Sequence, residues 1–227
     1  MKTLAALLAA AALAVTACAG PATAAEEAVN APAAARTAKE PKGLKTAIFA
    51  GGCFWGVEGV FSHVKGVKSA VSGYHGGTAK SAKYDVVSSG MTDHAESVRI
   101  TYDPAVVRYD QLLRIFFSVV ADPTLKNRQG PDVGAHYRSA IVPTNGEQAA
   151  VAKAYIAQLG KAGLWKRPIA TQIESYKAFY PAEAYHQDYM INNPNSRYIV
   201  RWDAPKVAAL KTMFPAMYRS TFLRDAG

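Results

Sequence analysis

"AIFAGGCFWGVEGVF", residues Ala47 to Phe61, joins a short apolar run to a glycine pair, a cysteine and a helix-like pattern. The apolar run, which begins just after Lys45 and ends at Ala50, predicts a buried strand. Beyond Cys53 the apolar side chains recur at helical spacing, which predicts a helix that lies against a sheet. A strand that turns through two glycines directly into a helix is a unit of a mixed α/β domain, and it places the cysteine at the helix N-terminus.

The rest of the body of the chain mixes strand and helix patterns. Apolar alternation from Glu96 to Tyr102 predicts a strand, and Asn145 is a candidate cap for a helix that runs to Gly163. We expect further strands at residues 67–77, 138–143 and 168–175, further helices at 109–120, 182–190 and 204–214, and a long polar loop at 122–137. Strands and helices do not alternate regularly, so we expect an α+β fold: a two-layer α/β sandwich, ferredoxin-like, with long irregular loops.

The N-terminus has the layout of a secretory signal, with one lysine, an apolar run and then small residues. The run from Leu4 to Val15 is too short to span a membrane. Two processing sites compete: an ordinary signal-peptidase site that ends at Ala24, and a lipobox-like "VTAC" in which Cys18 would be lipidated. Both interpretations export the protein, and we expect it in the periplasm, with a membrane contact only through a lipid anchor at Cys18.

These signals suggest a division of the chain. We expect a signal over residues 1–24, a flexible Ala- and Pro-rich linker over 25–43, one catalytic domain over 44–220 and a tail over 221–227. The formal net charge is +9, but the basic residues are scattered and form no nucleic-acid-binding signature. Five dispersed histidines show no ligand spacing, so we expect no metal, no cofactor and no nucleic-acid partner. We expect a monomer.

Cys53 is the only cysteine outside the signal region. Unpaired N–H groups at a helix N-terminus favour a thiolate, so this position would lower the pKa of the thiol and make it a nucleophile. The alternative is a small, inert core residue, because free cysteines are commonly buried. Position alone leaves these two interpretations about equal.

The sequence around the cysteine favours the nucleophile. "GCFWG", residues 52–56, resembles the active-site signature of peptide methionine sulfoxide reductases of the A type. Further blocks resemble the same family in the same order: "GYHGG" at 73–77, "HAESVRITYDP" at 94–104, "DPTLKNRQGPDVGAHYRSAI" at 122–141 and "AEAYHQDY" at 182–189. The resemblance implies an enzyme that reduces the S epimer of methionine sulfoxide, free or in oxidised proteins, and so repairs them.

The resemblance also assigns roles to residues. It implies that Cys53 attacks the sulfoxide and becomes a sulfenic acid, and that Glu96 is the carboxylic acid that protonates the oxygen. By the same resemblance, Tyr74 and Tyr137 donate hydrogen bonds to that oxygen. The pocket for the substrate methyl group would be formed by Phe54 and Trp55, with Asp132 as a further site residue.

Each role has a structural alternative: a solvent-facing carboxylate for Glu96, core packing for the tyrosines, and a structural role for His186 rather than a catalytic one. A cysteine hydrolase would instead use His94 or His186 as its base, and an exported binding module would use the basic surface on anionic polymers or membranes.

The C-terminal segment lacks the extra cysteines with which many members of the family resolve the sulfenic acid. We therefore expect an external thiol, such as a thioredoxin-like protein, to reduce Cys53 directly. The alternative is a disulfide between Cys18 and Cys53, which requires Cys18 to escape both lipidation and cleavage.

Overall fold

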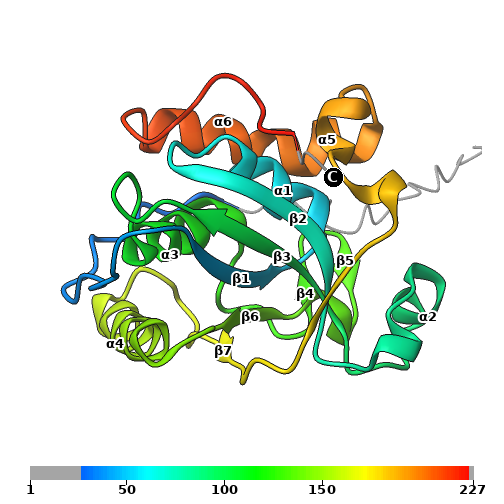
Figure 1. Cartoon of the computed structure of the whole chain (residues 1–227), viewed down its shortest axis with the longest axis horizontal. Helices are drawn as coiled ribbons and strands as arrows, with labels where there is room; N and C mark the ends of the chain where they lie inside the picture. The colour runs from blue at the N-terminus through cyan, green and yellow to red at the C-terminus, as the bar shows by residue number, and fades with distance from the viewer. Residues whose placement is uncertain (1–26, 225–227) are drawn as a thin grey trace, which may run out of the picture.

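The structure is a computed structural model that describes residues 27–224 of the 227-residue chain. Within these residues, six strands form one sheet in the order β7-β6-β1-β3-β2-β8, shown in Figure 1. The strands are β1 (Lys45–Gly51), β2 (Val67–His75), β3 (Ala95–Tyr102), β6 (Ser139–Val142), β7 (Gln172–Ile173) and β8 (Phe179–Pro181). All neighbouring strands are antiparallel except β6 and β7, which are parallel. The predicted signal, including Cys18, lies outside the described residues.

The helices in residues 27–224 are α1 (Phe54–Ser62), α2 (Tyr84–Ser88), α3 (Tyr109–Ile115), α4 (Gly146–Ala162), α5 (Tyr189–Asn192) and α6 (Ala204–Met213). Short turns of helix connect them: η1 (Ala79–Ser81), η2 (Phe116–Val120), η3 (Ala135–Tyr137), η4 (Ala184–His186) and η5 (Ile199–Asp203). Helix α1 packs directly on β1, β2 and β3. It lies between the sheet and α6 (Figure 1). No helix in residues 27–224 is long and apolar enough to cross a bilayer.

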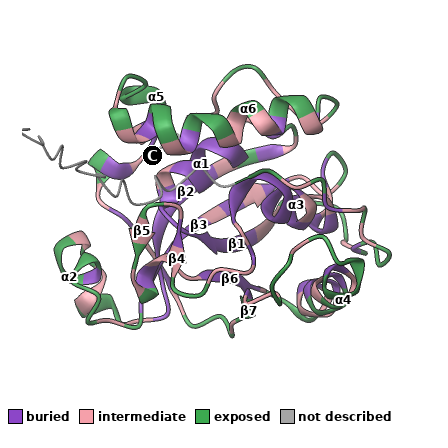
Figure 2. Ribbon diagram, turned by 180° about the vertical axis from the view of Figure 1, so that it is seen from behind, coloured by how far each residue is buried: buried purple, intermediate pink, exposed green. Residues whose placement is uncertain are grey.

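The predicted strand-turn-helix unit is present, and it explains where the core lies. Because side chains alternate along β1, Phe49 faces the helices while Ile48 joins a smaller apolar cluster on the opposite face. The Phe49 ring lies 5.5 Å from that of Phe61 in α1 and 5.3 Å from that of Phe116 in η2. Full burial of side chains of this size stabilises the fold by roughly 1.5–3 kcal/mol each. Figure 2 shows that buried residues are concentrated along β1, β3 and α1.

Four predicted elements differ in detail. The expected helix over 182–190 is the short turn η4 followed by α5, which begins only at Tyr189. The expected helix over 109–120 is α-helical only to Ile115 and then widens into the π-helical turn η2. The expected strand over 168–175 pairs only at Gln172–Ile173, at the edge of the sheet. The polar loop over 122–137 contains a small hairpin, β4 (Arg128–Gln129) with β5 (Asp132–Val133), followed by η3. The Asn145 cap is confirmed, because its side chain accepts a hydrogen bond from the N–H of Gln148 at 2.9 Å.

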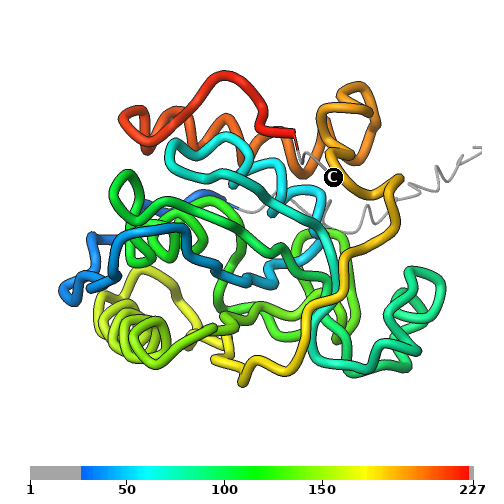
Figure 3. The backbone as a smooth tube through the Cα atoms, viewed as in Figure 1, coloured from blue at the N-terminus to red at the C-terminus, as the bar shows by residue number. Residues whose placement is uncertain are grey.

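Residues 29–40, which we name the N-terminal strap, lie against the folded domain. The backbone can be followed as a tube in Figure 3. The Val29 N–H donates to the Ser118 carbonyl at 2.9 Å, and the Glu40 carboxylate accepts a hydrogen bond from the Tyr102 hydroxyl. Along the strap, Ala31 is fully buried. This packing corrects the predicted flexible linker over that part of its length, because small alanine side chains can insert between helices where bulkier ones cannot.

Candidate active site

Cys53 occupies the position that the sequence predicts, immediately before the first residue of α1. The chain reaches it through Gly52, whose φ of +85° is a conformation that side-chain-bearing residues rarely adopt. A Cβ at Gly52 would lie 2.5 Å from Cβ of Gln129, so a glycine is also required for space. The Cys53 residue is 9% exposed. The thiol therefore lies at the start of a helix in a nearly closed site.

Glu96 lies directly beside the start of the same helix. Its Oε2 accepts a hydrogen bond from the Phe54 N–H at 3.0 Å, and the residue is 2% exposed, so it does not face solvent. Burial raises the pKa of Glu96 to about 8; the Phe54 hydrogen bond opposes this shift, and the charges of Asp132 and Asp203 add to it. Glu96 thus holds a proton at neutral pH, as a general acid must.

The thiol itself differs from the expectation. The helix N-terminus was expected to lower its pKa, but burial raises the pKa of Cys53 well above its ordinary value, and the negative charges of Glu96, Asp203 and Asp132 raise it further. The backbone N–H of Trp55 acts in the opposite direction and does not prevail. The effect of the helix N-terminus is worth only about 1 kcal/mol, whereas desolvating a thiolate among carboxylates costs more. Burial among these carboxylates therefore keeps the Cys53 thiol protonated.

The two predicted tyrosines are not equivalent. The Tyr74 hydroxyl donates to Oε2 of Glu183 at 2.9 Å, so this hydroxyl already has an acceptor. Tyr137 ends η3, and the pKa of its phenol is raised by burial and then by Glu96, Asp132 and Cys53, which places it among the site charges. Sequence reasoning missed a third phenol, Tyr84, whose pKa burial and the charges of Glu96 and Cys53 raise to about 12. All three stay neutral donors at physiological pH.

Phe54 and Trp55 form an aromatic wall with residues from distant segments. Phe54 is 1% exposed and its ring lies 5.9 Å from that of Tyr74. The Trp55 indole stacks on the Tyr189 ring at 3.7 Å, and its Nε1 donates to Nδ1 of His186 at 3.1 Å. Trp55 is thereby fixed in orientation at the half-buried side of the wall. A flat aromatic surface of this kind suits an apolar methyl group.

The histidines do not support a cysteine hydrolase. Nδ1 of His186 is engaged by the Trp55 indole, which fits the structural role expected for it. In His94, Nδ1 accepts from the Gly77 N–H at 3.2 Å and Nε2 lies 3.0 Å from the Thr78 carbonyl oxygen. Each histidine that was a candidate base therefore has a structural partner, and burial lowers the pKa of each ring.

Asp132 lies in a small polar cavity beside the thiol. Its Oδ2 accepts a hydrogen bond from the Tyr198 hydroxyl. The cavity holds about 10 Å³, and Cys53, Asp132, Tyr198, Asp203 and Lys206 are among its lining residues. Tyr198 and Asp203 were not predicted. The only sequence signal at Asp203 is the Asp-Ala-Pro pattern of a helix start, which predicts the cap position of α6 but no place in the site.

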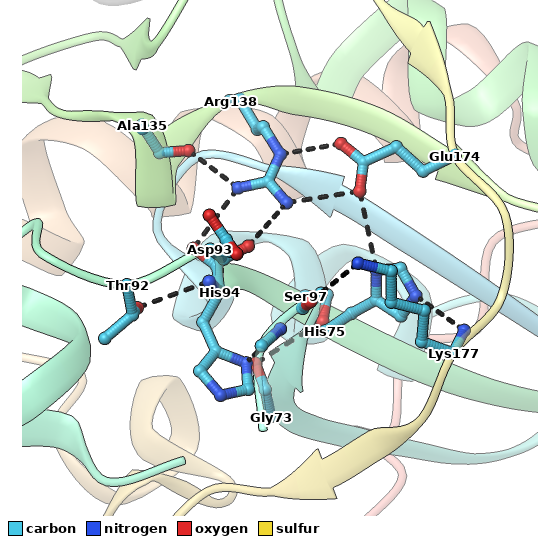
Figure 4. Close-up of polar contacts among 12 residues, drawn as sticks. Gly73, His75, Thr92, Asp93, His94, Ser97, Ala135, Arg138, Glu174 and Lys177 are labelled. Atoms are coloured by element: carbon cyan, nitrogen blue, oxygen red, sulfur yellow. Dashed lines mark hydrogen bonds and ion pairs between the residues drawn. The ribbon is translucent and has the colours of Figure 1, made fainter. Parts of the chain in front are cut away.

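Behind the site, Arg138 connects the segments that carry the catalytic groups (Figure 4). Its guanidinium binds both oxygens of Glu174, at 2.6 and 3.1 Å, and donates to the carbonyls of Asp93, His94 and Ala135. Because Tyr137 precedes Arg138 and Glu96 follows His94 by two residues, this clamp fixes η3 against the start of β3. No cluster of metal-ligating side chains is found in residues 27–224.

A buried thiol at a helix start, a protonated carboxylic acid beside it and neutral tyrosine hydroxyls are the groups that an enzyme with a cysteine nucleophile and a general acid requires. A family model described as peptide methionine sulfoxide reductase matches residues 45–217. The chain belongs to this family; it is an oxidoreductase that reduces methionine sulfoxide, as the resemblance of its motifs implied.

Individual relatives and solved structures agree. The chain is 58% identical over 180 residues to peptide methionine sulfoxide reductase MsrA 2 of Mesorhizobium japonicum, an alignment that covers 79% of this chain and 92% of that protein. The MsrA 2 of Synechocystis sp. is 51% identical over 173 residues, or 76% and 81% of the two chains. The fold is similar to reduced Mxr1 from Saccharomyces cerevisiae, with a TM-score of 0.58, 32% identity and coverage of 71% and 92%. Methionine sulfoxide reductase A of Corynebacterium diphtheriae gives a TM-score of 0.57, 30% identity and coverage of 77% and 86%.

Proposed function

We propose that the chain reduces the S epimer of methionine sulfoxide through a Cys53 sulfenic acid. The observation that carries this proposal is the position of Glu96, buried beside the Phe54 N–H with its pKa raised to about 8. Glu96 gives its proton to the sulfoxide oxygen and receives the proton of the Cys53 thiol as the sulfur attacks. The oxygen passes to Cys53, the cysteine sulfur is oxidised to the sulfenic acid, and the substrate sulfur is reduced to methionine.

This exchange explains why a raised thiol pKa is compatible with catalysis. A neutral thiol beside a neutral carboxylic acid carries no net charge in a buried site, so the resting state avoids the cost of an unpaired buried charge. Charge develops only during the reaction. The sulfoxide gains a positive charge as its oxygen accepts a proton, and this charge stabilises the thiolate that forms at Cys53.

Selectivity for one epimer follows from three fixed contacts. The methyl group lies on the Phe54 and Trp55 wall, the oxygen faces Glu96 and Tyr137, and the sulfur must face Cys53. Only one hand of the sulfoxide satisfies all three contacts. With the two epimers of N-acetyl methionine sulfoxide supplied separately, methionine release should come from the S epimer alone, and comparable kcat/KM for both epimers would contradict the proposal.

Recycling of the enzyme needs a thiol from outside the domain. No cysteine follows Cys53 in the sequence, and it is the one free cysteine in residues 27–224. We therefore assign reduction of the sulfenic acid to an external dithiol such as a thioredoxin-like protein. Oxidised proteins and peptides are the other partners, and the enzyme acts as a monomer in this proposal.

The N-terminal signal completes the proposal. The apolar run and small residues of 1–24 support export to the periplasm, either as a soluble protein cleaved after Ala24 or as a lipoprotein anchored at Cys18. Mass spectrometry of the mature N-terminus distinguishes the two routes. We also assign the core of the fold to the ferredoxin-like class, supported by the element order β1-α1-β2-β3-α3-β6 with neighbouring strands β6-β1-β3-β2.

A further inference from the structure

Arg138 lies at the junction of two segments that carry catalytic groups. Tyr137 precedes it in the chain, and its guanidinium donates to a carbonyl oxygen of the same helical turn, η3, at 3.0 Å. The guanidinium also donates to the carbonyls of Asp93 at 3.0 Å and of His94 at 3.2 Å, at the entry to β3 (Figure 4). One side chain therefore ties the turn that carries Tyr137 to the strand that carries Glu96.

A carboxylate from a third segment, which follows β7, holds this guanidinium. Glu174 accepts from Nε and Nη2 of Arg138 at 2.6 and 3.1 Å, a fork that fixes the plane of the guanidinium. Nδ1 of His75 lies 3.5 Å from the same carboxylate, and His75 is 1% exposed. Burial raises the pKa of Glu174, but the hydrogen bonds of His75 and Arg138 outweigh it and lower the pKa to about 2. Glu174 is therefore ionised at neutral pH.

A glycine makes room for this arrangement. Gly76, in the family block "GYHGG", has a φ of +110°, which residues with side chains rarely adopt. A Cβ there would lie 2.5 Å from the carbonyl oxygen of Asp93 and 3.0 Å from Nη2 of Arg138. A side chain at position 76 would therefore displace one of these two hydrogen-bond partners.

An open cavity of about 460 Å³ borders the pair of Arg138 and Glu174. Among the described residues, its lining includes both of these side chains and Lys177, but neither Cys53 nor Glu96. A small cation that enters this cavity therefore meets the Glu174 carboxylate and not the thiol.

We infer that Arg138 is a positioning residue for the reduction of the sulfoxide: it holds Glu96 and Tyr137 at the spacing at which both reach the sulfoxide oxygen. Arg138 binds backbone carbonyls and Glu174, so it acts through the segments that it joins. Misplacing a catalytic group by about 1 Å can slow a reaction by roughly 10²-fold. This inference rests on the proposed role of Glu96 as the proton donor.

The test begins with Arg138→Ala. We expect kcat to fall roughly 10²-fold and KM to stay within about 3-fold, because the clamp does not hold the aromatic wall that receives the methyl group. Guanidinium chloride at a non-denaturing concentration should restore kcat by roughly 10-fold, because guanidinium reproduces the fork on Glu174, whereas methylammonium chloride should not. Arg108→Ala is the matched control, because its guanidinium forks onto Asp110 at 3.0 and 2.9 Å and joins no catalytic segment. It should leave kcat unchanged.

A double-variant cycle shows whether Arg138 acts through Glu96. In a Glu96→Gln background the proton that Arg138 helps to place is already absent, so adding Arg138→Ala should cost less than about 10-fold. A full further loss of roughly 10²-fold would show that the two residues act independently and would overturn the inference.

The remaining outcomes are also decisive. A loss of kcat that guanidinium restores and methylammonium does not supports the inference. Wild-type kcat in Arg138→Ala overturns it, and so does a loss that both cations or neither restores. If Arg138→Ala does not fold, Arg138→Lys replaces it, because lysine keeps the charge but cannot fork onto Glu174; wild-type kcat there overturns the inference. If Glu96→Gln alone keeps the wild-type rate, the proposed proton transfer fails instead.

Discussion

Among single residues, Glu96 holds the proton on which the proposed reduction of methionine sulfoxide depends. Because burial raises its pKa to about 8, the acid form predominates at neutral pH and is lost as the pH rises through that value. We expect the rate of methionine formation to be high below pH 8 and to fall above it. The ionised Glu96 would also disfavour the neighbouring thiolate, so both effects act in the same direction.

The substitution Glu96→Gln removes the acidic proton and keeps the shape of the side chain. It should slow methionine formation by roughly 10²- to 10⁴-fold and abolish the fall near pH 8. Single-turnover rates of methionine formation between pH 6 and 9 measure both the loss of rate and the change in the pH profile. A wild-type profile that keeps rising to pH 9 would show that thiol ionisation, rather than Glu96, controls the rate.

The tyrosines differ in a way that mutation should reveal. Since the Tyr74 hydroxyl already donates to Glu183, Tyr74→Phe should lower kcat/KM less than Tyr137→Phe, for which we expect a loss of roughly 10²-fold. The double variant should lose about the product of the single losses, because the Tyr74 proton is given to Glu183 and only the Tyr137 hydroxyl is left to donate to the substrate oxygen. A double loss well above that product would show that Tyr74 also donates to this oxygen.

The motif residues were predictable from the sequence, and their environment was not. Cys53 at a helix start follows from local periodicity and the glycine turn. The direction of its pKa shift does not, because it depends on burial and on Asp132 and Asp203, which reach the thiol from remote parts of the chain. Tyr198 and Asp203 escaped prediction for the same reason: their segment has neither a motif nor a sustained period.

At the scale of elements, the N-terminal strap is part of the fold. The Glu40 carboxylate accepts from the Tyr102 hydroxyl and from the Tyr109 N–H, the latter at 3.2 Å. Glu40→Ala leaves these groups without their acceptor and should lower the free energy of unfolding by about 2 kcal/mol. Thr37→Ala, at an exposed strap position, is the control and should change it by less than about 0.5 kcal/mol. Equal denaturant midpoints for both variants would show that the strap does not stabilise the domain.

The prediction of helices and strands succeeded where the apolar pattern is long and failed at the edge of the sheet. Helix α4 and its Asn145 cap were predicted because the helical pattern extends over seventeen residues and the capping residue stands directly before it. The strand expected over 168–175 is reduced to Gln172–Ile173, since an edge strand with both residues exposed needs no apolar alternation. The strap was missed because alanine and proline composition is shared by linkers and by closely packed extended segments.

At the scale of the whole molecule, the sheet order determines which groups meet. The side-by-side pairing of β1 with β3 brings Glu96 to the helix start that follows β1, and Tyr74 of β2 lies opposite Glu96 in the adjacent pair. A mixed strand and helix pattern predicts the class of fold but not this order, because strand pairing joins residues far apart in the sequence. The family resemblance supplied the roles that the pattern alone left open.

In the proposed reaction, Cys53 alone carries the oxygen from the substrate to the reductant. The most direct measurement mixes the enzyme, free of reductant, with excess methionine-S-sulfoxide and quantifies methionine and Cys53 modification by dimedone. We expect one methionine per enzyme and one dimedone adduct at Cys53, and neither product in Cys53→Ser. More than one methionine per enzyme, or a full yield with Cys53 unmodified or joined in a disulfide to Cys18, would contradict it.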